Sequence, residues 1–80
     1  SHAAMVRAVA LAPEDAGKQY GLACTRARLG QTEEALAALS RSVDLGYTDA
    51  DWAARDADLR SLRSLPEFEA ILARMRGGAR

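Results

Sequence analysis

The chain has 80 residues, with eleven acidic and eleven basic side chains that give a formal net charge of zero. This length corresponds to one small domain, and the charge balance argues against a nucleic-acid-binding module and against a polybasic membrane anchor. One Cys and one His exclude a disulfide framework or a zinc cluster within the chain. No run of apolar residues is long enough to span a membrane. Eighteen Ala and ten Leu predict an all-α fold.

Two helices are predicted in the first third of the chain. The first covers about residues 3–12 and is stopped by Pro13, because proline cannot continue a helix. The second begins after Asp15, whose carboxylate can cap it, and ends near Gly30, a residue suited to a left-handed helix terminus. Tyr20, Ala23, Cys24 and Ala27 form one stripe on this second helix.

A third helix is predicted from Thr32 to the glycine at position 46. Thr32 can cap its N-terminus, and Glu33 and Glu34 lie where negative charge favours the helix dipole. Gly46 supplies the terminating residue. The face expected to be buried consists of Ala35, Leu36, Leu39, Ser42 and Val43.

The last third of the chain begins with residues 48–51, which are typical of a capping box that opens a fourth helix. We expect Trp52 to anchor this helix in the core. Residues 56–64 are predicted to form a short turn or 3₁₀ segment that inserts Leu59 and Leu62. A second capping box over 64–67 opens the final helix, which Gly77-Gly78 ends and whose apolar positions are Phe68, Ile71, Leu72 and Met75.

The chain also repeats itself with a period of 34 residues. Shifting the sequence by this amount aligns residues 3–16 with residues 37–50. The identical pairs are Ala3/Ala37, Ala4/Ala38, Arg7/Arg41, Val9/Val43, Leu11/Leu45, Asp15/Asp49 and Ala16/Ala50. A period of 34 is typical of helix–turn–helix units that stack into a solenoid.

Several positions within residues 16–47 carry a resemblance to a known family. They are Leu22-Ala23 in a Leu-Gly slot, Leu29-Gly30 at a helix end, Ala35 and Leu39 in an Ala-x₃-Phe pair, and Ser42 at a later small position. On these residues the chain resembles the tetratricopeptide repeat (TPR) family. The chain departs from the family pattern where Gln19, Arg26 and Tyr47 replace the family's Trp, Tyr and Pro.

The resemblance implies an organisation for the whole chain. Beyond Ala50 the 34-residue offset fails, yet residues 49–68 look like the degenerate tail that closes many bacterial TPR arrays. We therefore expect a single TPR-like domain of antiparallel helical hairpins over residues 1–80. Its parts are a tag remnant at 1–2, the second helix of a partial repeat at 3–13, a full repeat at 15–47, a divergent C-terminal cap at 48–76 and a frayed tail at 77–80.

The residues able to perform catalysis or bind a metal are few in this chain. The acidic residues around Trp52 are Asp49, Asp51, Asp56 and Asp58, and we interpret them as helix caps and solvated surface. They lack the spacing and the glycine of a calcium loop. Cys24 is expected to be a small buried or groove-lining thiol, and no Ser–His–Asp set or phosphate-binding glycine motif is present. The sequence predicts no enzyme, cofactor or metal site.

The TPR resemblance also implies a binding face, because the first helix of each unit in that family lines a concave groove for extended peptides. The residues that would face this groove are Gly17, Tyr20, Gly21, Cys24, Ala27 and Arg28. The Lys and Asn that clamp a peptide's terminal carboxylate in some members are absent from the matching positions. Tyr20 has two readings that the sequence leaves open, an anchor for a ligand or a side chain that packs between helices.

These observations predict a non-catalytic protein–protein interaction or scaffolding module that binds a peptide or partner helix on its concave face. The alternative is a structural C-terminal cap or self-association module of a larger bacterial enzyme or regulator, with homo-oligomers formed through the exposed solenoid end. The single Cys24 suits a reducing cytoplasm, and residues 3–12 lack the basic start of a signal peptide. The predominance of Arg over Lys, with the alanine content, is typical of a GC-rich bacterial genome.

Overall fold

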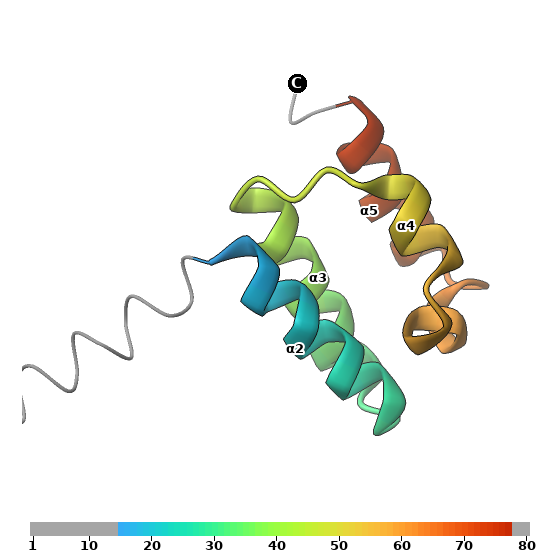
Figure 1. The fold of residues 1–80 in the computed structure, drawn as a ribbon. Coiled ribbons are helices and arrows are strands. Elements are labelled where there is room, and N and C mark those ends of the chain that lie inside the picture. The colour runs from blue at the N-terminus through green and yellow to red at the C-terminus, as the bar shows by residue number, and fades with distance from the viewer. Residues whose placement is uncertain (1–14, 78–80) are drawn as a thin grey trace, which may run out of the picture.

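The computed structural model describes residues 15–77, and in this part of the chain every regular element is helical (Figure 1). The elements are α2 (Ala16–Arg28), α3 (Thr32–Asp44), α4 (Ala50–Arg55), the 3₁₀ helix η2 (Ala57–Leu62) and α5 (Pro66–Gly77). The predicted all-α class is therefore confirmed for the described residues. The helix predicted over 3–13, the tag remnant at 1–2 and positions 78–80 of the tail lie outside them.

Helices α2 and α3 run antiparallel and lie side by side (Figure 1). Asp15 caps α2 as predicted, because its Oδ1 accepts the backbone N–H of Lys18 at 3.1 Å. Helix α2 ends before Gly30, whose φ of 79° lies in the left-handed region that glycine adopts without strain. The tight turn that follows returns the chain along α2.

Helix α3 begins differently from the sequence prediction. The capping position is Gln31 and its side chain makes no capping hydrogen bond, so the prediction that Thr32 is the cap was wrong. The Gln31 carbonyl accepts the backbone N–H of Ala35 at 2.8 Å, which already includes Thr32 in the first helical turn. The predicted end is confirmed, because Gly46 follows α3 with a φ of 113°.

Helix α4 is capped by Asp49, whose Oδ1 accepts the backbone N–H of Trp52 at 3.1 Å. The cap predicted at position 48 is therefore one residue too early. The prediction that Trp52 anchors the core was also wrong, since this residue is 49% exposed. Ala50 and Ala53 are the buried residues of α4, and at about 100° per residue Trp52 lies about 200° round the helix from Ala50.

The 3₁₀ segment predicted after α4 is confirmed as η2, with Leu59 and Leu62 fully buried. Helix α5 begins with Pro66 at its first position, where the missing N–H costs no hydrogen bond. Ser64 lies two residues before this start and so is not its cap. The apolar stripe predicted for α5 is buried in full, and its members are Phe68, Ile71, Leu72 and Met75.

One core joins all five elements. Helix α2 packs against α3 and against η2, while α3 also packs against α5 and η2. Ala23 and Ala35 are both fully buried in this core. Arg74 of α5 donates to Ser40 Oγ at 2.9 Å and pairs with Asp44, so polar contacts also join α5 to α3. The α2 face that contacts η2 is where the candidate site lies.

Candidate partner-binding site

A hydrogen-bonded cluster joins α2 to the start of η2. The Tyr20 hydroxyl donates to Asp56 Oδ2 at 2.7 Å, and the Cys24 thiol donates to the same oxygen at 3.6 Å. The other oxygen, Asp56 Oδ1, accepts the backbone N–H of Asp58 at 3.0 Å and so caps η2. One carboxylate therefore starts a helix and holds that helix against α2.

The protonation states follow from burial and from these bonds. Burial raises the pKa of Tyr20, and the bond to Asp56 raises it further. Burial and the negative charge of Asp56 raise the pKa of Cys24 to about 11. Burial alone would raise the pKa of Asp56, but the hydrogen bonds from Tyr20, the Asp58 backbone and Cys24 together hold it below its ordinary value. At neutral pH the phenol and thiol are neutral donors and the carboxylate is an ionised acceptor.

Tyr47 extends this cluster from the segment between α3 and α4. Its ring stacks on Tyr20 with centroids 4.4 Å apart and an angle of 13° between the ring planes. Stacked aromatic pairs add about 0.5–1.5 kcal/mol beyond their burial. Position 47 is one of the places where the sequence departs from the family pattern, and the structure assigns this tyrosine a packing role against α2.

The structure separates the six predicted binding residues into two groups. Tyr20, Cys24 and Ala27 are buried, so their side chains do not reach a partner. Of the two readings of Tyr20, its 8% exposure supports packing between helices. Gly17, Gly21 and Arg28 are exposed. Much of the α2 face that the TPR resemblance assigns to a peptide groove is thus covered by the chain's own η2.

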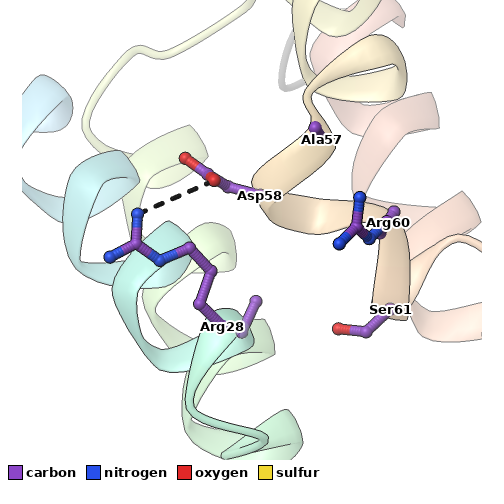
Figure 2. Close-up of a pocket in the computed structure, with 6 residues that line it drawn as sticks. Arg28, Ala57, Asp58, Arg60 and Ser61 are labelled. Carbon is purple, nitrogen blue, oxygen red and sulfur yellow. Dashed lines mark ion pairs between the residues drawn. The ribbon is translucent and has the colours of Figure 1, made fainter.

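A cleft remains open where the C-terminal end of α2 faces η2. Its volume is about 430 Å³, and its walls are Ala27 and Arg28 from α2 with Ala57, Asp58, Arg60 and Ser61 from η2 (Figure 2). Arg28 Nη1 lies 3.8 Å from Asp58 Oδ1, and both side chains are substantially exposed. Two of the six predicted residues therefore line a cavity.

Sequence reasoning missed the η2 side of this cleft. Arg60 and Ser61 were placed in a short turn or 3₁₀ piece with no role beyond inserting Leu59 and Leu62. The alternation of buried and exposed residues along η2 is the signal that could have found them, because burying Leu59 and Leu62 leaves the two residues between them outside the core.

A second, more apolar groove lies on a different face of the α2–α3 hairpin. Its volume is about 310 Å³, and its lining residues are Gln19, Leu22, Arg26, Glu34, Ala37, Ala38 and Arg41. Leu22 is 38% exposed, and Leu29 near the hairpin turn is 66% exposed. Leu22 was expected to fill a packing slot of the repeat, and here it lines a groove.

One set of potential metal ligands occurs among the described residues. Cys24, Asp56 and Asp58 place one ligand atom each within 4.8 Å of one another. A metal needs the thiolate, and the raised pKa of Cys24 keeps the thiol protonated at neutral pH. Hydrogen bonds within the fold already engage the Cys24 and Asp56 side chains, and the Asp58 carboxylate faces the Arg28 guanidinium.

Comparison of the chain with protein-family models, with curated proteins and with solved structures gave no match. Among the described residues, no helix has both the length and the apolar character needed to cross a membrane.

Proposed function

We propose that the chain is a non-catalytic protein-interaction or scaffolding module, built as the closing end of a TPR-like helical stack in a bacterial cytoplasmic protein. The arrangement of contacts supports this proposal. Helix α2 pairs with α3 and then packs sideways against η2, and α3 packs sideways against α5. Sideways contact between successive hairpins is how helical repeats bury a continuous core.

The observation that supports the proposal is the open cleft between α2 and η2, which lies next to the hydrogen-bonded cluster of Tyr20, Cys24 and Asp56. The Tyr20–Asp56 bond holds η2 over α2, and the cleft at the end of α2 leaves Arg28 and its neighbours exposed beside this closure. A partner would contact residues 16–29 here, through the exposed Arg28. Arginine is among the residue types that contribute most to protein interfaces.

The titratable groups support binding rather than catalysis. A general base needs a free, suitably tuned group within reach of a substrate proton. Asp56 accepts three hydrogen bonds within the fold, and Asp58 faces the guanidinium of Arg28. The thiol of Cys24 is protonated at neutral pH and buried, which is the opposite of an activated nucleophile.

The second candidate function is a structural C-terminal cap or self-association module of a larger bacterial enzyme or regulator. The groove lined by Leu22 favours it, because Leu22 and Ala37 are exposed there and offer apolar surface that another helix would cover. In this case the groove would be covered either by a preceding unit of the same chain or by a second copy.

The experiment that tests the proposal is site-specific photocrosslinking in cells of the native host. Benzoylphenylalanine replaces Ser61 at the cleft or Leu22 at the apolar groove, and Glu69, an exposed residue of α5 that lines neither cavity, is the control position. We expect a reproducible crosslink from position 61 to a different protein, identified by mass spectrometry and absent from position 69.

The other outcomes are equally decisive. Crosslinks from position 22 to the same polypeptide, or to a second copy of it, with none from position 61, would replace the proposal with the second candidate. Sedimentation velocity over a concentration series then separates a preceding unit, which leaves the chain monomeric, from self-association. Crosslinks at neither position above the control level would contradict both functions.

A further inference from the structure

We propose that the cleft between α2 and η2 receives an acidic side chain, Glu or Asp, from an extended segment of a partner protein. This inference rests on the proposed interaction function and names the chemistry of the partner. It concerns Arg28, Arg60 and Ser61, which project into or beside the cleft from its two walls (Figure 2).

The charge of the cleft favours an acidic ligand. Its six lining residues include two guanidinium groups and one carboxylate, so the cavity has an excess of positive charge. The whole chain is neutral, so this excess is a local feature. A carboxylate is the complementary group, since guanidinium binds it with two parallel hydrogen bonds.

The ion pair between Arg28 and Asp58 leaves guanidinium donors available for a ligand. The 3.8 Å separation of Arg28 Nη1 and Asp58 Oδ1 is longer than a hydrogen bond, and both side chains are exposed. A guanidinium has five N–H donors, so Arg28 keeps most of them for another acceptor. The Arg60 side chain has no hydrogen-bond or ion-pair partner among residues 15–77.

The shape of the cleft favours a side chain of a passing segment. Ala27 and Ala57 contribute only methyl groups, which leave room between the walls, and Ser61 points from η2 toward α2. The volume of about 430 Å³ exceeds what one carboxylate needs. The lining side chains of η2 that carry charge or a hydroxyl are exposed or half-buried, so a chain can cross the cleft without ending in it.

The two walls are held in place before any partner arrives. Tyr20 of α2 and Asp56 at the start of η2 share a 2.7 Å hydrogen bond, and Leu59 and Leu62 anchor η2 in the core. The backbone segments that carry Arg28 and Arg60 are therefore already fixed relative to each other before a partner binds. Such preorganisation reduces the entropic cost of forming the complex.

The test is a titration of the ¹⁵N-labelled full chain, followed by amide chemical shifts. The probes are two blocked hexapeptides, acetyl-hexaglutamate amide and acetyl-hexaglutamine amide. We expect hexaglutamate to shift the amides of residues 27–28 and 57–61, and hexaglutamine to leave them unchanged. Raising the salt from about 50 mM to about 300 mM should weaken the binding, because exposed charges are screened.

Matched variants assign the effect to the cleft. Arg60→Gln should weaken hexaglutamate binding about fivefold to tenfold. Arg76→Gln removes the same charge from α5, at a residue that does not line the cleft, and should change the affinity less than about twofold. Both variants should keep the amide spectrum of the parent outside the substituted segment, which shows that they are folded.

Several results would overturn the inference. Equal shifts from hexaglutamine, shifts mapped away from the cleft, or equal losses in both variants would each exclude an acidic side-chain site. Tighter binding at the cleft by hexaglutamine with a free terminal carboxylate, or by a short oligothymidylate, would assign the cleft to a chain terminus or to phosphates instead. A crosslinked partner at position 61 whose contact segment is neutral would reject this inference and retain the proposed interaction function.

Discussion

At the scale of single residues, Asp56 connects three elements of the described chain. It follows α4, caps η2 and accepts hydrogen bonds from two side chains of α2. Hydrogen bonds to an ionised group are stronger than neutral ones. The stability of the α2–η2 contact therefore depends on one negative charge.

Replacing Asp56 by Asn should lower the free energy of unfolding by about 1–3 kcal/mol, because the charged acceptor of two α2 donors is lost. Urea denaturation measures this change. The control is Asp51→Asn, an exposed residue in the first turn of α4, for which we expect a loss of less than about 1 kcal/mol. Equal effects of the two substitutions would show that the bonds of Asp56 add nothing to stability.

Stability should also fall in acid through the same residue. The pKa of Asp56 is lower in the folded chain than in the unfolded chain, so its contribution is complete above the unfolded pKa, near 4. It is lost as the pH falls from about 4 through the lower folded pKa. Thermal denaturation across this range should give a steeper acid decline for the parent than for Asp56→Asn, and parallel profiles would contradict the prediction.

The position of η2 could be predicted from the sequence, but the hydrogen bond between Asp56 and Tyr20 could not. A short turn or 3₁₀ segment that inserts Leu59 and Leu62 is predicted over residues 56–64, and η2 confirms it. The bond to Tyr20 joins residues 36 positions apart and depends on the angle at which η2 crosses α2. No local spacing encodes that angle, so Asp56 was interpreted as cap or solvated surface, and Tyr20 kept two readings.

At the scale of the elements, small side chains let helices approach closely. Ala23 on α2 and Ala35 on α3 are fully buried in the same core. A tightly packed interior has no space for extra methylene groups, so such positions are sensitive to added volume. The pairing of α2 with α3 therefore depends on small side chains between the helices as well as on the burial of apolar surface.

Replacing Ala35 by Leu should destabilise the fold by about 1–3 kcal/mol through overpacking. Thermal unfolding followed by far-ultraviolet circular dichroism measures the change. Ala70→Leu makes the same substitution at an exposed position of α5 and should change stability by less than about 0.5 kcal/mol. An unchanged melting temperature for Ala35→Leu would be inconsistent with close packing of the hairpin.

Two glycines should respond to alanine in opposite directions. Gly21 lies inside α2, and an added Cβ there would meet no atom of residues 15–77 within 4 Å, so Gly21→Ala should stabilise by about 0.5–1 kcal/mol. Gly46 has a φ of 113°, so Gly46→Ala should destabilise by about 1 kcal/mol or more. Chemical denaturation of both variants checks the signs, and a loss of stability in Gly21→Ala would indicate that another segment approaches this position closely.

The ends of the elements were predicted unevenly, for a physical reason. Gly30 and Gly46 follow helix ends with positive φ values, which glycine adopts without strain. A glycine directly after a helical pattern therefore indicates the helix end in the sequence. Trp52 was assigned to the core by default, as an apolar residue in a helical pattern. In a helix of six residues the two alanines decide which face is buried, and the larger side chain is left half exposed.

At the scale of the whole molecule, a single core spans both the hairpin and the C-terminal segments. The buried residues of α2, α3, α4, η2 and α5 form one cluster, with Tyr47 and Leu65 packed against it from the connecting segments. A chain this short has little core to divide, so neither half is expected to be stable without the other.

We therefore expect unfolding in one cooperative transition. The fluorescence of Trp52, the single tryptophan, reports on α4, and far-ultraviolet circular dichroism reports on all helices. The two signals should give the same midpoint in urea. A fluorescence midpoint at clearly lower urea would show that α4, η2 and α5 separate from the hairpin first, and would place the cleft walls in different folding units.

The parallel rings of Tyr20 and Tyr47 have a spectroscopic consequence. Two phenol chromophores held 4.4 Å apart in a fixed orientation couple their electronic transitions, and the chain contains no other tyrosines. The tyrosine contribution to the near-ultraviolet dichroic band would therefore report on the separation of α2 from the segment that follows α3. Opening of the molecule at that point becomes observable by optical means, without an attached dye.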